Sequence, residues 1–429
     1  MDKKRQFPKT LALIIILGVS VWVVFASDFS MLVSGYLAIL RSPSILTSDY
    51  LKIGGLSATL FNVVTILLLN IAMVRRLNIH VTGPVIAGIM TIAGFSFFGK
   101  NLFNTLPIYL GIYLFARSQN LEFKNFIIVV LFSTGISPLV SFMVFGMQWG
   151  TWLGLPALFN PLIGGIAGIG VGVFTGFILP TLSAHTIRFH KGYNLYNVGF
   201  ALGIVSMVFS AILRSFDAVD LNQGGQISEA YHTELYVFTI VISVLFILYG
   251  VLSTRILKTE YPRLLKSSGR LVSDFVHHHG MNATLLNIGI MGLLSIAVIT
   301  VMDFRIHGPL MGGILTVMGF AAFGKHPRNT IPLMIGAVLA VWISDYSFES
   351  AGMVTAVLFV TALAPVAGRY GVLIGILAGF LHIMVTPLAL NFQEGGFNLY
   401  NNGFAAGFIA ALIIPFMEML HRNKGDGAL

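Results

Sequence analysis

The stretch FGKNLFNTLP at residues 98–107 returns later in the chain as FGKHPRNTIP at residues 323–332. It belongs to a longer match, in which residues 55–116 align without a gap with residues 280–341 and share 24 identities in 62 positions. Repeats of this length in apolar segments are what membrane transporters use to build two halves around one path. The match therefore predicts a duplicated membrane domain.

A second repeated motif supports the duplication. The sequence GYNLYNVGFALG begins at residue 192 and GFNLYNNGFAAG begins at residue 396, with 9 of 12 positions identical. The offset in numbering between copies is larger for the first motif than for the second, so the second half has lost part of the chain between its motifs. We predict a first membrane repeat at residues 1–216, an external linker at 217–234 and a second repeat at 235–429.

The composition places most of the protein surface in lipid. Apolar residues make up 56% of the 429 positions and charged residues 10%, with a mean hydropathy of +0.88. Soluble globular domains carry roughly 25% charged residues. Apolar runs recur along the chain, and most are long enough to supply the roughly 20 helical residues that cross a bilayer. The alternating segments of a transmembrane barrel do not occur, so we expect an all-α, polytopic transmembrane protein.

Fourteen apolar segments are candidate membrane helices, seven in each half. They lie at residues 10–26, 56–74, 81–98, 105–116, 125–147, 161–180 and 197–213, then 235–254, 283–302, 308–323, 330–344, 351–367, 371–390 and 402–420. The segments 105–116 and 330–344 are short for a crossing, and the sequence leaves open whether each spans the membrane or re-enters it with its predecessor. Because seven and five crossings per half are both odd numbers, we predict two repeats of inverted topology.

Lysine and arginine residues set the orientation, because cytoplasmic loops of membrane proteins carry an excess of them. With fourteen crossings and a cytoplasmic N-terminus, 20 of the 25 basic residues fall in inside loops. The outside loops hold Arg41, Lys52, Lys100, Arg214 and Arg305. We therefore predict a multi-pass protein of the cell membrane with both termini in the cytoplasm. The net charge of +9 follows from the same bias, so we expect no nucleic-acid partner.

The FGKxxxNTxP motif predicts a helix break with an open N-terminus, because Gly99 and Gly324 would each end a helix. The next helix would begin at residues suited to N-capping, which are Asn104, Thr105, Asn329 and Thr330. Free N–H groups at such an end favour an anion, and Lys100 and Lys325 each add a positive charge. We predict that the two lysines and the four capping residues bind substrate. The alternative is an interfacial turn whose lysine reaches the lipid headgroups.

The GxNLYN motif places amides and an aromatic hydroxyl just before a helix with glycines four residues apart. The candidate substrate-binding residues are Asn194, Tyr196 and Asn197 in the first copy and Asn398, Tyr400 and Asn401 in the second. Amides both donate and accept, so they can replace the hydration shell of a polar solute. We predict two mouths of one path on opposite faces, with Tyr196 near the Lys325 break and Tyr400 near the Lys100 break. The alternative is that the asparagines cap helices that pack through their glycines.

The chain carries no enzymatic constellation. The glycine-rich stretch at residues 164–172 lies in an apolar segment without a preceding strand or a Walker lysine, so helix packing explains it better than phosphate binding. Paired carboxylates, HExxH and nucleophile-elbow patterns are absent from the sequence, which also has no cysteine. We therefore expect no catalytic residue, no cofactor and no metal site.

The twin FGKxxxNTxP and GxNLYN motifs resemble those of the bacterial integral-membrane family catalogued as domain of unknown function 1576. The resemblance covers essentially the whole chain, but this family implies no substrate. The phrase GMNATLL at residues 280–286 is similar to the GYNATLV phrase of urea transporters, which also have two inverted halves. The corresponding GLSATL at residues 55–60 of the first half lacks the asparagine.

Together these features predict a transporter or channel for a small polar solute, anions included, whose path lies between the two repeats in the lipid bilayer. Two alternatives stay open: a passive urea-like channel, and a membrane-embedded enzyme or receptor without transport activity. A coupled transporter usually carries an acidic residue within the membrane, and none lies mid-helix here, so a channel stays open as an interpretation. The sequence does not fix the substrate, the coupling ion or the oligomeric state, for which a homo-oligomer is one arrangement.

Overall fold

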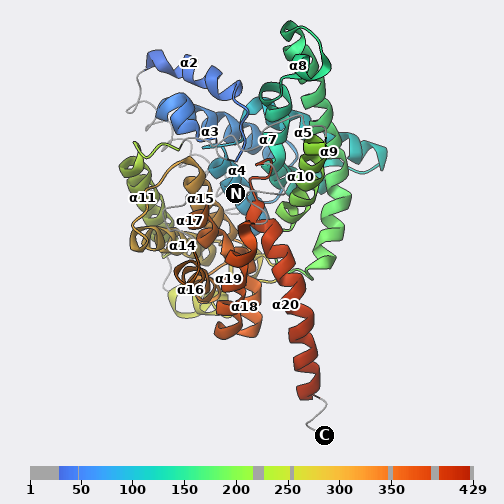
Figure 1. Ribbon diagram of the computed structural model, residues 1–429. Coiled ribbons are helices and arrows are strands. Elements are labelled where there is room, and N and C mark those ends of the chain that lie inside the picture. The colour runs from blue at the N-terminus through green and yellow to red at the C-terminus, as the bar shows by residue number, and fades with distance from the viewer. Residues whose placement is uncertain are drawn as a thin grey trace.

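A computed structural model of the protein describes residues 29–46, 48–215, 227–251, 256–345, 351–387 and 396–425. The first predicted segment, residues 10–26, lies outside these ranges, as does most of the predicted linker. The described residues form helices and turns, which confirms the all-α fold class (Figure 1). We refer to residues 29–215 as the first half and to residues 227–425 as the second half.

The first half contains α2 (Phe29–Leu40), α3 (Tyr50–Arg76), α4 (Gly83–Phe95), α5 (Leu102–Ser118), η1 (Phe123–Phe126), α6 (Ile127–Ser133), η2 (Thr134–Ile136), α7 (Ser137–Ser141), η3 (Phe142–Gly146), α8 (Trp149–Leu153), η4 (Ala157–Phe159), α9 (Asn160–Phe189) and α10 (Asn197–Ser215). The second half contains α11 (His232–Gly250), η5 (Ile256–Glu260), α12 (Tyr261–Leu264), α13 (Phe275–His279), α14 (Met281–Val301), α15 (Gly308–Phe320), α16 (Pro327–Ile343), α17 (Ala351–Phe359), η6 (Val360–Leu363), α18 (Ala364–Tyr370), α19 (Val372–Pro387) and α20 (Asn401–Gly425).

The described residues include eight helical segments that are long and apolar enough to cross a membrane, and they indicate a membrane protein. Shorter apolar helices lie among them, such as α4 and α15 with 13 residues each. Every predicted segment in the described ranges overlaps one or more helices. The sequence analysis missed α2, because 12 residues are too few for a membrane crossing.

The same helix pairs form in both halves. α2 packs on α3 and α11 packs on α14, whereas α5 packs on α9 and α16 packs on α19. The α5–α9 contact requires glycine, because a Cβ atom on Gly176 would lie 2.1 Å from Ile108 O. Gly379 has the same role between α16 and α19, where its Cβ position lies 2.0 Å from Leu333 O. These glycines allow the helix backbones to approach closely, as is common in membrane bundles.

A glycine interrupts the start of α3 and separates α13 from α14 at the equivalent position of the second half. Gly55 has φ 75° and ψ 176°, and Gly280, its equivalent in the repeat, has φ 82° and ψ 159°. L residues with a side chain rarely adopt this region, so the glycine is needed at both positions. The first turn of α3 thus corresponds to α13.

The short helices α4 and α15 pack against each other across the two halves. Gly83 at the start of α4 lies against Ala322, which follows α15. Gly308 at the start of α15 lies against Phe97, which follows α4. The two helices therefore run antiparallel to each other.

Two aspartates, separated by the same offset as the copies of the first motif, tie these short helices to the opposite half. Asp49 caps α3 and also accepts a hydrogen bond from Gly308 N of α15 at 3.4 Å. Asp274 caps α13 and accepts from Gly83 N of α4 at 2.9 Å. Burial raises the pKa of Asp49 to about 6, although the hydrogen bonds that its carboxylate accepts oppose the shift.

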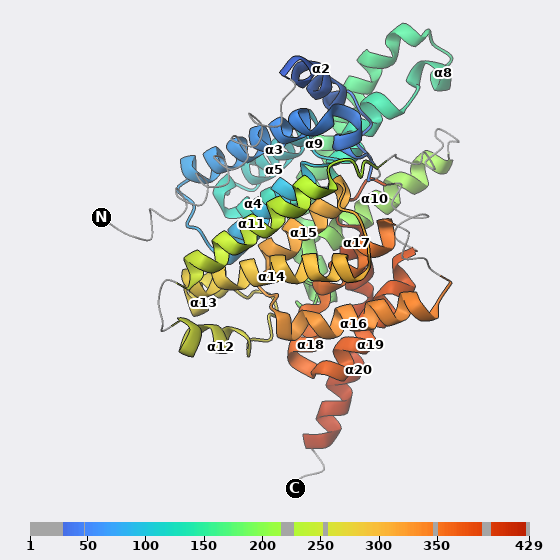
Figure 2. The same ribbon diagram turned by 90° about the vertical axis from the view of Figure 1, so that its left-hand side faces the viewer.

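The helices α10 and α20 begin next to each other at the interface between the halves. Gly199 lies against Tyr400, and Gly403 lies against Tyr196. From this contact α20 runs away from the rest of the fold in both views, whereas α8 and the start of α9 project at the opposite end (Figures 1 and 2). Two helices thus start inside the protein, with their N-termini on the opposite half.

Candidate functional site

Both copies of the FGKxxxNTxP motif break the chain between two helices, first between α4 and α5 and then between α15 and α16. The N-cap residues are Asn101 and His326, three positions before Asn104 and Asn329, so the predicted capping positions were wrong. Asn104 and Asn329 instead accept a hydrogen bond from the backbone N–H of the N-cap residue, at 2.9 Å in both copies. Their Nδ2 atoms donate to the carbonyl oxygen of the motif glycine at 3.0 and 2.9 Å. Both amides therefore hold the break in place.

The motif threonines are buried in the first turns of α5 and α16. Thr330 Oγ1 donates to His326 O at 2.9 Å. Thr105 Oγ1 has no hydrogen-bond partner among the residues that the structure describes. The two copies therefore differ in how the threonine hydroxyl is satisfied.

Lys100 and Lys325 have no exposed surface. A lysine that reached the lipid headgroups would expose its ammonium group, so the interfacial-turn alternative is wrong. Within the described ranges neither lysine forms an ion pair. The orientation count placed Lys100 outside and Lys325 inside, and their burial removes one basic residue from each side without changing the sign of the bias.

The Lys325 ammonium group is bound by the opposite half and by its own. Lys325 Nζ donates to Tyr196 OH at 2.5 Å and to Thr361 Oγ1 at 2.7 Å. It also lies 4.4 Å from the centre of the Tyr196 ring and 5.2 Å from that of Phe320. Cation–π contacts of this kind stabilise a buried ammonium group in place of water. The predicted approach of Tyr196 to the Lys325 break is therefore confirmed.

The Lys100 break meets the other NLYN motif. The rings of Phe95 and Tyr400 are 4.5 Å apart, and Lys100 Nζ lies 5.6 Å from the centre of the Phe95 ring. A Cβ atom on Gly99 would touch the Leu399 side chain at 2.5 Å. The predicted approach of Tyr400 to the Lys100 break is thus confirmed as well, but here Lys100 Nζ has no hydrogen-bond partner in the described part of the chain.

The first asparagine of each NLYN motif bridges the two halves. Asn194 Nδ2 donates to Gly403 O at 2.8 Å, and Asn398 Nδ2 donates to Gly199 O at 3.1 Å. In both copies Oδ1 accepts from the backbone N–H of the motif tyrosine at 2.9 Å. Both amide groups are therefore hydrogen-bonded to backbone atoms.

The second asparagine of the motif has different surroundings in the two copies. Asn197 Oδ1 accepts from Thr186 Oγ1 at 2.8 Å and lies 2.9 Å from His190 Nε2. Asn401 Oδ1 instead accepts from the backbone N–H and the amide of its neighbour Asn402, at 2.7 and 2.8 Å. Asn402 Oδ1 lies 3.0 Å from Nε2 of His382 in α19. In the second half Asn402 therefore makes the histidine contact that Asn197 makes in the first half.

The two NLYN motifs meet at one place, and the predicted placement at two mouths on opposite faces was wrong. The rings of Tyr196 and Tyr400 are 5.8 Å apart, and both side chains are fully buried. Opposite faces of a bilayer core would lie roughly 30 Å apart. Because Tyr196 contacts Lys325 and Tyr400 lies against Phe95 beside Lys100, all four motif copies surround one buried region between the halves, which we call the lysine–tyrosine site.

The sequence analysis missed two asparagines that support this site. Asn62 Nδ2 donates to the carbonyl oxygens of Ser96 and Lys100, both at 2.8 Å. Asn287 makes the equivalent hydrogen bonds in the second half, to the residue after α15 and to Lys325 O at 2.7 Å. Both asparagines are identical across the repeat and lie within apolar helices, which is the signal that could have identified them.

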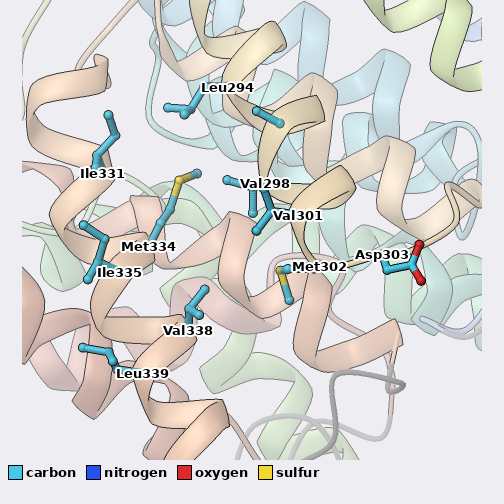
Figure 3. Close-up of a pocket in the computed structure, with 11 residues that line it drawn as sticks. Leu294, Val298, Val301, Met302, Asp303, Ile331, Met334, Ile335, Val338 and Leu339 are labelled. Carbon is cyan, nitrogen blue, oxygen red and sulfur yellow. The ribbon is translucent and has the colours of Figure 1, made fainter.

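A groove lies elsewhere, between α14 and α16 (Figure 3). It has a volume of about 530 Å³ and is lined by Leu294, Ala297, Val298, Val301, Met302, Asp303, Ile331, Met334, Ile335, Val338 and Leu339. Apart from Asp303, these side chains are apolar, and Val301 is 87% exposed. The groove therefore offers an apolar surface to its surroundings and does not suit a polar solute.

Comparison with known proteins identifies the family. The family model described as "Protein of unknown function (DUF1576)" matches residues 29–215 and 253–419, so that each half of the fold carries one matched range. No curated protein and no solved structure matches the chain. The chain therefore belongs to the DUF1576 family of proteins of unknown function.

Proposed function

We propose that this protein is a multi-pass membrane transporter or channel that moves a small anionic solute along a path between its two halves. The observation that carries the proposal is the burial of Lys100 and Lys325 at two helix breaks, each beside the tyrosine motif of the opposite half. Charged residues inside membrane proteins are costly and mark pathways for ions or substrates. Neither lysine is paired with a carboxylate in the described ranges. An anionic solute therefore supplies the negative charge that balances the ammonium group.

We further propose that the two halves have inverted topology. The antiparallel pairing of α4 with α15 and the crossed capping by Asp49 and Asp274 support it. The α10 and α20 helices, which start at the interface between the halves, match the broken helices from which transporters build a site at the bilayer midplane. The excess of basic residues in the predicted inside loops supports a cytoplasmic position of both termini.

Cysteine labelling tests the inversion. His80 and Arg305 are equivalent positions of the two halves, both exposed, and the chain contains no native cysteine. In sealed cells we expect an impermeant thiol reagent to label the Arg305→Cys variant and not the His80→Cys variant, because inversion puts these loops on opposite faces. Permeabilised cells, in which both variants should react, serve as the control. Labelling of both variants in sealed cells would exclude inverted repeats.

Transport by purified protein in liposomes tests the function. We expect uptake of ¹⁴C-formate or ¹⁴C-acetate, and a loss of about tenfold or more in Lys100→Met and Lys325→Met. A hydrogen bond to a charged group contributes roughly 1.5–3 kcal/mol, and 1.4 kcal/mol corresponds to a factor of ten. Methionine keeps most of the apolar stem and removes the charge.

Lys52→Met is the matched control for these variants, since Lys52 is exposed on α3 and should leave uptake unchanged. ¹⁴C-urea provides a second arm. Uptake of urea alone, equal in the wild-type protein and both lysine variants, would support a passive urea-like channel and contradict the proposal.

A further inference from the structure

The repeat assigns a partner to each residue around the two lysines. Leu195 N donates to Ala362 O, and Leu399 N donates to Gly135 O, both at 2.9 Å. Ala362 and Gly135 are therefore equivalent positions. The residues before them, Thr361 and Thr134, are equivalent too.

Within the lysine–tyrosine site, Lys325 and Lys100 are each surrounded by the same kinds of group, a tyrosine and a threonine, but their hydrogen bonds differ. In the second half Lys325 Nζ donates to both Tyr196 OH and Thr361 Oγ1. In the first half the corresponding atoms are Lys100 Nζ, Tyr400 OH and Thr134 Oγ1. All three are buried, and none has a hydrogen-bond partner among the described residues.

Nearby hydroxyl groups do not donate to the first-half atoms. Thr91 lies near Tyr400 OH but donates its own proton to Ala87 O at 2.8 Å. Tyr109 lies near Thr134 but donates to Asn70 Oδ1 at 2.7 Å. The protons of these two hydroxyls are therefore used elsewhere.

Three unsatisfied polar atoms in one buried region require a physical explanation. Burying a polar group without a hydrogen bond is unfavourable, and an unpaired buried ammonium group is the most unfavourable case. Buried polar groups without a protein partner usually bind water, an ion or a ligand. The second half shows that the fold can close the same site with its own tyrosine and threonine, so the open site of the first half is available to a ligand.

We propose that Lys100, Thr134 and Tyr400 bind one small monovalent oxyanion, such as a carboxylate, while the equivalent second-half site is closed by Tyr196 and Thr361. One ammonium group and two hydroxyl groups supply hydrogen-bond donors and a single positive charge, which matches a single negative charge shared by two or three oxygens. The Phe95 ring, beside both Lys100 and Tyr400, forms an apolar wall that favours a small ligand. The role of this anion site in transport rests on the proposed function. The binding of the anion does not depend on it.

The threonine pair provides a matched test in the purified full-length protein. Thermal unfolding is measured while sodium formate replaces sodium chloride at constant ionic strength. We expect formate to stabilise the wild-type protein and the Thr361→Val variant with similar midpoints. In Thr134→Val we expect the formate midpoint to rise at least tenfold, because one donor to the anion is lost.

Stability without formate gives a second readout from the same variants. Thr361→Val and Tyr196→Phe each remove a hydrogen bond to Lys325, so both should unfold at a lower temperature than the wild-type protein. Thr134→Val and Tyr400→Phe remove a hydroxyl that has no hydrogen-bond partner among the described residues, so neither should. Tyr400→Phe also replaces Thr134→Val in the formate titration if the valine variant does not fold.

The outcomes separate this inference from the proposed function. The inference is overturned if formate gives no stabilisation, or if Thr134→Val and Thr361→Val respond to it alike. ¹⁴C-formate uptake that needs Lys100 but is unchanged in Thr134→Val would leave transport intact and still exclude this site. A Thr134-dependent stabilisation without uptake by the wild-type protein would support the site and contradict transport.

Discussion

Replacing Gly176 with alanine is expected to lower the free energy of unfolding by about 3 kcal/mol, at the upper end of the cost of overpacking a core. The new Cβ atom would lie 2.1 Å from Ile108 O and 3.1 Å from Gly111 Cα, both backbone atoms of α5. Backbone atoms of a packed helix cannot move aside as the end of a flexible side chain can. The change should therefore separate α5 from α9 and shift the Lys100 break at the start of α5. Equilibrium unfolding in detergent measures the effect.

Gly170 is the matched control, because it lies on the same helix and an added Cβ atom would meet nothing within 4 Å. Alanine is favoured over glycine in a helix by roughly 1 kcal/mol, so Gly170→Ala should leave stability unchanged or raise it slightly. Gly379→Ala, the equivalent change between α16 and α19, should resemble Gly176→Ala. Equal stabilities for Gly176→Ala and Gly170→Ala would contradict the close contact of α5 with α9.

The cross-half contacts could be predicted because both motifs are retained in both halves of the chain. Two motifs retained in both copies, together with an odd number of segments per half, paired Tyr196 with the Lys325 break and Tyr400 with the Lys100 break. This pairing depends on topology and requires no knowledge of helix lengths. It is therefore the kind of contact that a sequence repeat can specify.

The burial of the lysines and the meeting of the two tyrosines could not be predicted. The apolar runs of residues 197–213 and 402–420 have the length of full crossings, so their starts were assigned to opposite faces. Both helices instead begin inside the protein, where Gly199 and Gly403 allow the two N-termini to touch. A hydropathy profile shows how long an apolar run is, but not how deep in the protein the corresponding helix starts.

The partners of the lysines were missed for a different reason. Thr134 and Thr361 lie outside the gap-free alignment, at a slightly different offset, in stretches with little identity. Their equivalence follows from the hydrogen bonds of Leu195 and Leu399 to the neighbouring carbonyl oxygens. By contrast, Asn62 and Asn287 lie within the alignment, and an amide retained in both copies of an apolar helix already indicates a buried hydrogen-bonding role.

Replacing Asn287 with leucine is expected to destabilise the second half by about 3 kcal/mol, because each of two buried carbonyl groups left without a donor costs roughly 1–3 kcal/mol. Asn287 Nδ2 donates to Ala321 O at 2.8 Å and to Lys325 O at 2.7 Å, so it holds the chain on both sides of the break. Its loss should release the backbone that positions the Lys325 ammonium group. Hydrogen exchange at the amides of Lys325 and His326 should therefore increase before the rest of α16 opens.

Asn282→Leu is the matched control, since Asn282 lies in the first turn of the same helix α14 and is only partly buried. It should leave both the unfolding free energy and the exchange at Lys325 near their wild-type values. Asn62→Leu should reproduce the effect in the first half, with faster exchange at Lys100, because Asn62 makes the equivalent two hydrogen bonds. If Asn287→Leu destabilised the protein without faster exchange at Lys325, the asparagine would support α14 packing and not the break, and the position of the lysine would need another cause.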